Sequence, residues 1–157
     1  MDEVELAALL EGVDQYAGSY PIDLLTFKPD SGKSYIINLD RSGRRGSHWI
    51  ALHFVKESRK VYLFDSLNLP MELYYPQLIP FIRRYCNGNS LLCRNDIRLQ
   101  RYESNLCGYY TVLFILYMNR GASMSDFLLI FKGSTPELND VILCAFIKTF
   151  HDSLEIC

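Results

Sequence analysis

Apolar and polar positions predict short strands in the middle of the chain. Residues 34–39, 48–55 and 60–65 are short runs rich in β-branched and aromatic side chains, which is typical of buried strands. The charged segment 56–59 separates the last two runs, so we expect them to form a β-hairpin. Residues 91–99 alternate between apolar and polar positions well enough to form a further strand.

Helical patterns flank these strands at both ends of the chain. Residues 3–12 contain strong helix formers, and residues 71–86 place apolar side chains three and four positions apart. Residues 107–119 are an almost unbroken apolar run, which predicts a buried central helix. A last helix is expected over residues 137–151, beginning at position 137 or 139. This order of elements predicts an α+β domain.

Size and composition predict one domain over residues 1–157. The chain has 157 residues, of which 49% are hydrophobic, and this is enough to bury a core. Proline and glycine between positions 18 and 32 predict extended or looping chain there. The acidic N-terminus does not have a signal-peptide pattern, and the five cysteines are odd in number and widely spaced. These features predict a protein that is not secreted and stays in a reducing compartment.

Charge is distributed unevenly along the chain. Residues 31–120 carry thirteen Lys and Arg against six acids, whereas residues 1–30 and 121–157 are both acidic. A basic middle can contact nucleic acid or an acidic protein. The overall pI of 5.9 nevertheless argues against a dedicated nucleic-acid binder.

Several known catalytic motifs are absent from the sequence. The segment 31–34 (Ser-Gly-Lys-Ser) imitates the end of a phosphate-binding loop, but Phe27 stands where that loop needs its first glycine. The sequence has no Gly-x-Ser-x-Gly elbow, no His-Glu-x-x-His and no Cys-x-x-Cys pair. We therefore expect no metal site.

A histidine and an acid are placed at adjacent ends of the predicted hairpin. His48 begins the first hairpin strand behind a glycine-containing loop, and Asp65 ends the second strand. Because a hairpin reverses the chain, these two ends lie side by side. A carboxylate beside an imidazole fixes its tautomer and stabilises its protonated form.

A cysteine opens the predicted central helix. The free N–H groups and the positive dipole end at a helix start favour a thiolate at Cys107. Gly108 leaves room there for a substrate backbone, and Gln100 supplies a neutral amide donor for a developing oxyanion. A nucleophile, a base, an orienting acid and an oxyanion donor can therefore all be named.

Each of these residues also has an ordinary structural interpretation. Cys107 alone is more often a small buried hydrophobic residue, and Gln100 alone is most often a solvated amide. His48 alone could lie on the surface, and Asp65 alone could cap the following turn. Only their joint spacing favours catalysis.

These motifs together resemble those of the adenovirus protease (adenain) family and of the related proteases that process SUMO. The matching features are His48-Trp49, the acid at a strand end, and the pattern Gln-x-x-x-Ser-x-x-Cys-Gly over residues 100–108. The resemblance covers about residues 35–118, and the small size fits the viral enzymes. The tail pattern that begins at Asn139-Asp140 is similar to adenain-like proteins of large DNA transposons and invertebrate viruses.

The resemblance implies a papain-like cysteine protease fold in the permuted chain order histidine, acid, cysteine. A central mixed sheet would be flanked by helices, with the nucleophile at the start of a buried helix. By resemblance, Cys107 is the nucleophile, His48 the general base and Asp65 its partner. Gln100 forms the oxyanion hole with the backbone N–H of Cys107. The expected substrate-binding residues are Trp49, Gly46, Ser47 and Gly108, with Trp49 walling a narrow channel for glycine residues.

The expected function is a cysteine endopeptidase that cleaves after Gly-x-Gly or Gly-Gly in viral or virus-like structural-protein precursors. One alternative is a protease that removes SUMO, ubiquitin or a similar modifier. The other is a binding module of the same fold in which Cys107 is unreactive.

The resemblance also suggests partners. The chemistry requires no cofactor, but family members use an activating peptide and are stimulated by DNA. Cys93 lies near the place of the peptide-linked cysteine, with a shorter spacing to Gln100 than expected. A weak nucleic-acid contact would use a basic patch made of Arg41, Arg44, Arg45, Lys56, Arg59 and Lys60. We expect a monomer with protein substrates and no membrane contact, located in the host nucleus, the cytoplasm or a virion.

Overall fold

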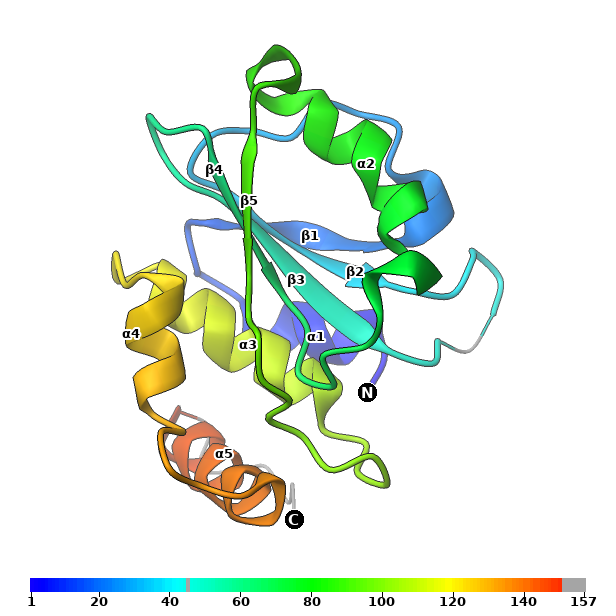
Figure 1. Ribbon diagram of the computed structural model, residues 1–157. Helices are drawn as coiled ribbons and strands as arrows, with labels where there is room; N and C mark the ends of the chain where they lie inside the picture. Colours follow the sequence, from blue (N-terminus) through cyan, green and yellow to red (C-terminus); the bar gives the residue numbers. More distant parts are fainter. Residues whose placement is uncertain (45, 151–157) are drawn as a thin grey trace.

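A five-stranded mixed sheet forms the centre of the protein (Figure 1). The computed structural model describes residues 1–44 and 46–150. The strands lie in the sheet in chain order, with β1–β2 and β4–β5 parallel and the two middle pairs antiparallel. They are β1 (Tyr16–Pro21), β2 (Ser34–Asn38), β3 (Trp49–Phe54), β4 (Lys60–Phe64) and β5 (Leu91–Arg94).

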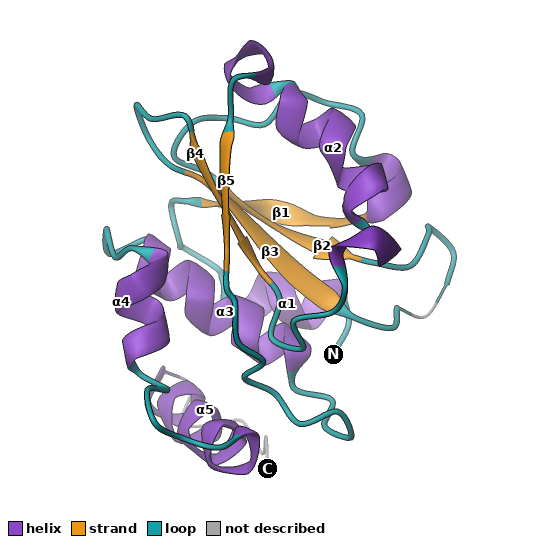
Figure 2. Ribbon diagram, viewed as in Figure 1, coloured by secondary structure: helices purple, strands orange, loops and turns teal. Residues whose placement is uncertain are grey.

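Helices cover both faces of this sheet (Figure 2). They are α1 (Glu3–Leu9), α2 (Tyr75–Arg83), α3 (Cys107–Met118), α4 (Met124–Leu129) and α5 (Pro136–Phe150), with 3-10 turns at Ile22–Leu24, Met71–Leu73 and Tyr85–Gly88. One face packs against α2, and the other packs against α1 and α3. Helix α5 contacts α3 on the side away from the sheet (Figure 1). The predicted α+β class with a mixed sheet flanked by helices is confirmed.

The alternation of side chains along the strands builds two cores. In β2, Ile36 packs into the core on the α3 side, while Tyr35 and Ile37 pack into the core on the α2 side. All three are buried. Helix α3 is apolar around its circumference and lies against β3, so it is the most enclosed helix, as the unbroken apolar run predicts.

The hairpin, the strand at residues 34–39 and the central helix are confirmed, while other predictions need correction. The segment 18–32 was expected to loop, but its first residues belong to β1, which pairs with β2. The strand predicted over 91–99 ends at Arg94. The helix predicted over 71–86 is divided, because Pro76 lies in the first turn of α2 and positive φ angles at Cys86 and Asn87 interrupt the chain after it.

Two further points concern the C-terminal half. Helix α4 was not predicted, and α5 begins at Pro136, just before the expected start. The expected end of α5 at His151 lies outside the described residues. Cys86, Cys93 and Cys107 are free thiols. Among the described residues, no helix is long and apolar enough to cross a membrane.

Candidate active site

Three chain segments meet at one end of the sheet. His48 comes directly before β3, Asp65 directly after β4, and Cys107 begins α3. Because β3 and β4 are antiparallel, with Ala51 opposite Phe64, the start of β3 lies beside the end of β4. The packing of α3 against β3 brings the helix start to the same place.

The His48 imidazole and the Asp65 carboxylate form a buried pair. Nε2 of His48 lies 2.7 Å from Oδ1 of Asp65, and both side chains are almost fully buried. Nδ1 of His48 is also buried and has no hydrogen-bond partner of regular geometry among the described residues. The acid therefore uses one ring nitrogen and leaves Nδ1 for another group.

Asp65 accepts hydrogen bonds from several further donors. Oδ1 accepts from the backbone N–H of Leu67 at 3.0 Å, and Oδ2 accepts from that of Leu69 at 2.9 Å and from the Tyr74 hydroxyl at 3.2 Å. Arg94 Nη2 lies 3.4 Å from Oδ2. Burial would raise the pKa of Asp65, but the His48 pair and these backbone donors outweigh it and lower the pKa, so the carboxylate stays ionised.

The backbone of Asp65 is held as firmly as its side chain. Asn95 Oδ1 accepts the Asp65 N–H at 2.9 Å, and Asn95 Nδ2 donates to the Asp65 carbonyl at 2.7 Å. Asn95 is buried. This reciprocal amide pair fixes the direction in which Asp65 leaves β4.

The thiol of Cys107 interacts with the imidazole of His48. Burial opposes ionisation of the thiol, but the His48 ring and the backbone N–H groups of Trp49 and Gly108 outweigh it and lower the pKa of Cys107. Burial likewise opposes protonation of His48, but Asp65 and Cys107 raise the pKa of His48 to about 9. The two groups therefore each stabilise the charged form of the other, thiolate on Cys107 and imidazolium on His48.

Gln100 is buried beside this pair in a fixed orientation. Its Oε1 accepts from the Ser66 hydroxyl at 2.7 Å, and its Nε2 donates to the Ser104 carbonyl at 2.6 Å. Its backbone N–H donates to the Ser66 carbonyl at 3.0 Å. Since an amide nitrogen carries two hydrogens, Nε2 keeps a second donor.

A cleft of about 400 Å³ contains most of the predicted site residues. Asp65 lies behind His48 and is fully buried. Gly108 is not among the residues that line the cleft, and a Cβ at this position would lie 2.3 Å from Met1 Sδ. The cleft is lined by Met1, Gly46, Ser47, His48, Trp49, Leu67, Gln100, Tyr102, Ser104, Asn105 and Cys107.

Sequence comparison places the chain in a family. The model of the adenovirus endoprotease family matches residues 18–138, which is most of the chain. The chain belongs to the adenovirus endoprotease family. Membership confirms the predicted resemblance to this family.

Individual relatives of this family member are distant. A protein of Acanthamoeba polyphaga mimivirus named as a thiol protease is 29% identical over 98 residues, which is 59% of this chain and 32% of that protein. The ASFV protease has a TM-score of 0.48 and 17% identity, over 75% of this chain and 43% of its own. The SUMO protease Ulp1, with its catalytic cysteine oxidised, has a TM-score of 0.37 and 16% identity, over 73% and 54%. The chain spans less than two thirds of each of these relatives.

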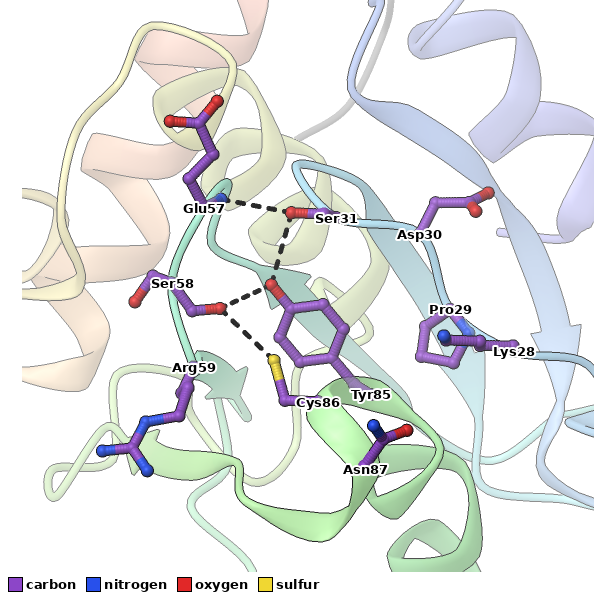
Figure 3. Close-up of a pocket in the computed structure, with 10 residues that line it drawn as sticks. All are labelled: Lys28, Pro29, Asp30, Ser31, Glu57, Ser58, Arg59, Tyr85, Cys86 and Asn87. Carbon is purple, nitrogen blue, oxygen red and sulfur yellow. Dashed lines mark hydrogen bonds between the residues drawn. The ribbon is translucent and has the colours of Figure 1, made fainter.

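A second pocket lies at the opposite end of the sheet (Figure 3). It has a volume of about 780 Å³ and lies between the turn that joins β3 to β4 and the end of α2. Its thiol, Cys86, donates to the Ser58 carbonyl at 3.7 Å, and Tyr85 donates to the same carbonyl. No histidine is among the described residues that line it, so this endoprotease family member has its thiol–imidazole pair in the cleft at Cys107.

Sequence reasoning did not find the residues that surround the acid. Tyr74, Arg94 and Asn95 approach Asp65 from α2's preceding turn and from the end of β5. One signal was present, because Arg94-Asn95 is a polar pair directly after an apolar strand. Among the described residues, no cluster of three or more His, Cys, Asp or Glu could hold a metal.

Proposed function

We propose that this protein is a cysteine endopeptidase with Cys107 as nucleophile, His48 as general base and acid, and Asp65 as the group that orients His48. One observation carries the proposal. His48, whose Nε2 lies 2.7 Å from Asp65 Oδ1, lines the same cleft as a thiol at the start of a buried helix. A thiol in this environment is primed for nucleophilic attack.

The chemical steps follow from these positions. The Cys107 thiolate attacks the peptide carbonyl carbon, and the electron pair of the C=O bond moves to oxygen. The tetrahedral intermediate collapses to a thioester, and the amine leaves with the proton of the His48 imidazolium. Neutral His48 then takes a proton from water as the water attacks the thioester, and Cys107 leaves as thiolate.

The oxyanion of each intermediate needs a donor. We assign this role to the Gln100 amide and to the backbone N–H of Cys107. Gln100 lines the cleft beside Cys107, and its hydrogen bonds with Ser66 and Ser104 hold the amide in place before substrate arrives. Donors that are oriented in advance stabilise the oxyanion without reorganisation.

The shape of the cleft supports small residues before the scissile bond. Trp49 lines the cleft together with Gly46, Ser47 and Cys107, so a bulky indole borders the place where the scissile bond would lie. Glycine-type sites of the Gly-x-Gly or Gly-Gly kind are therefore the proposed substrates. The proposed source of these sites is a viral or virus-like protein precursor, met in a host cell or virion. An activating peptide, DNA contact and a monomeric state belong to the same proposal and rest on family resemblance alone.

A reactive probe tests the proposed site. A diglycine vinyl sulfone is expected to label the native chain rapidly and to label neither Cys107→Ala nor His48→Ala. Cys86→Ser is the matched control, because Cys86 is a free thiol in the pocket at the other end of the sheet. Labelling that is slow and unchanged in His48→Ala would contradict the assigned base.

The same protein preparations distinguish the two substrate classes. Short diglycine peptides are expected to be cleaved with kinetics similar to those of reporters carrying a folded modifier. A preference of 100-fold or more for SUMO or ubiquitin reporters would instead favour the deconjugating protease. An unreactive Cys107 in all assays would favour the binding module.

A further inference from the structure

Both neighbours of Gln100 in the chain are attached to α5. Asn139 Nδ2 donates to the Leu99 carbonyl at 3.0 Å, and Asp140 Oδ2 accepts from Arg101 Nε at 3.0 Å. The two α5 residues are adjacent in sequence, so one helix turn holds the Leu99 backbone directly before Gln100 and the Arg101 side chain directly after it. We call Asn139 and Asp140 the α5 clamp.

The α5 clamp also contacts the helix that carries the nucleophile. Tyr110, one turn after Cys107 in α3, donates its hydroxyl to Asp140 Oδ1 at 2.9 Å and lies 3.4 Å from the Leu99 carbonyl. Burial and the Asp140 carboxylate raise the pKa of Tyr110 far above its ordinary value, so the hydroxyl stays a donor. One network therefore joins α3, α5 and the segment that carries Gln100.

Apolar side chains at the two positions of the α5 clamp could also pack α5 against the protein. Asn139 and Asp140 are buried at helix positions where apolar side chains would pack, and Asn139 Oδ1 has no hydrogen-bond partner among the described residues. A buried polar atom without a partner costs free energy. Hydrogen bonds, unlike apolar contacts, fix direction, and the atoms held here are backbone and side-chain groups on both sides of Gln100.

We infer that the α5 clamp is a positioning device that sets the place of the Gln100 amide relative to Cys107. Ser66 and Ser104 orient the Gln100 side chain, while Asn139 holds the backbone carbonyl directly before it and Asp140 holds the Arg101 side chain directly after it. Asn139 and Asp140 touch neither substrate nor the reacting atoms in this arrangement. The inference rests on the proposed function, because it concerns the oxyanion donor of that reaction.

The clamp predicts a specific kinetic effect. A donor that is displaced by a fraction of an ångström stabilises the oxyanion less, while substrate binding and thiol reactivity are unaffected. The test uses Asn139→Leu, Asp140→Asn and Tyr110→Phe in the full chain. Leu138→Ala and Val141→Ala are the controls, since both side chains are exposed on α5 beside the clamp.

Three measurements test the position of the Gln100 amide. We expect kcat for a diglycine peptide to fall about tenfold with KM unchanged, and binding of a diglycine aldehyde, whose adduct places an oxygen in the oxyanion hole, to weaken similarly. Alkylation of Cys107 by iodoacetamide, which forms no oxyanion, should stay within about twofold of the native rate. Adding Gln100→Ala to a clamp variant should cost nothing beyond Gln100→Ala alone.

Two results would overturn the inferred role of the α5 clamp. One is a kcat in folded clamp variants equal to that of the two controls. The other is an equal loss of kcat and of iodoacetamide reactivity, which means general disruption of the site. Tyr110→Phe removes one hydroxyl and keeps the ring packing, so it gives a folded variant if the other two do not. The proposed function is tested separately, by comparing the peptidase activity of the native chain with that of Cys107→Ala.

Discussion

His48 and Asp65 meet through the Nε2 atom of the imidazole, 2.7 Å from the carboxylate. This contact determines which ring nitrogen faces the acid and which faces the thiol. Nε2 is taken by the acid, so Nδ1 is the nitrogen available to the thiol of Cys107. The orientation depends on a carboxylate that itself accepts backbone N–H groups of Leu67 and Leu69 and is fully buried.

Asp65→Asn should remove most of the activity. The amide would turn an N–H₂ group toward donors that now bind an oxygen, so the His48 ring would lose its fixed tautomer. We expect kcat/KM to fall on the order of 100-fold or more and stability to fall by about 3 kcal/mol. Peptide hydrolysis and urea unfolding measure the two effects. Asp96→Asn, an exposed acid on the chain after β5, is the control, and equal behaviour of the two variants would contradict the role of Asp65.

The pH dependence should distinguish hydrolysis from alkylation. Peptide hydrolysis needs both the Cys107 thiolate and a protonated His48, so kcat/KM should decline as pH rises above about 9, where His48 loses its proton. Alkylation by iodoacetamide needs only the thiolate, so its rate should not decline there. In acid both should fall, at a pH below the ordinary thiol range because the pKa of Cys107 is lowered.

His48→Ala provides the check on this interpretation. Without the imidazolium, the alkylation profile of Cys107 should move upward toward that of an ordinary thiol, whose pKa is about 8.5. An unchanged profile would mean that the helix start and the backbone donors alone ionise the thiol.

Tyr74→Phe should separate stability from chemistry. The hydroxyl donates to Asp65 at 3.2 Å from a buried ring, and the carboxylate keeps its bonds to Leu67, Leu69 and His48 when it is lost. We expect a loss of about 1 kcal/mol in the free energy of unfolding and less than about a threefold change in kcat/KM. Chemical unfolding followed by fluorescence measures the first value. A fall in kcat/KM well beyond about threefold would instead assign Tyr74 a direct part in orienting the acid.

Gly46→Ala should damage the cleft more than Gly43→Ala does. Both glycines have φ near +80°, so alanine is strained at either position. At Gly46, however, the added Cβ would lie 2.3 Å from Asn38 Nδ2, whereas at Gly43 it meets nothing within 4 Å. Gly43→Ala should therefore lose about 1 kcal/mol of stability. Gly46→Ala should lose more stability than this. It should also raise KM, because its loop precedes His48. Equal effects in the two variants would contradict the crowding of Gly46 against Asn38.

The elements that the sequence predicts closely are those with continuous or regularly spaced apolar side chains. Strands β2, β3 and β4 and helix α3 have long apolar signals, and their places were predicted closely. Strand β1 was missed because Gly18 and Pro21 are typical of turns, and its residues are only half-buried. Helix α4 is six residues long, which is too short for a periodic pattern to be distinguished.

The candidate site likewise contains residues that the sequence could predict and residues that it could not. His48, Asp65, Gln100 and Cys107 could be named because each stands at a predicted element end and the spacing among them is distinctive. Asn95 could not be assigned to Asp65, since 30 residues separate them in the chain and only the β4–β5 pairing brings them together. Asn139 and Asp140 were noticed as a pattern, but their contact with Leu99 and Arg101 depends on how α5 packs, which local sequence does not encode.

The enclosure of α3 has a consequence for how enzymes of this shape can diversify. The proposed nucleophile stands at the start of a helix that tolerates little change, because eight of the twelve residues of α3 are buried. Several other lining residues of the cleft, in contrast, lie in connecting segments, among them Gly46, Ser47, Tyr102 and Asn105. Substitutions at these positions, with His48 and Gln100 kept, can therefore alter which peptides fit the cleft while Cys107 stays where it is.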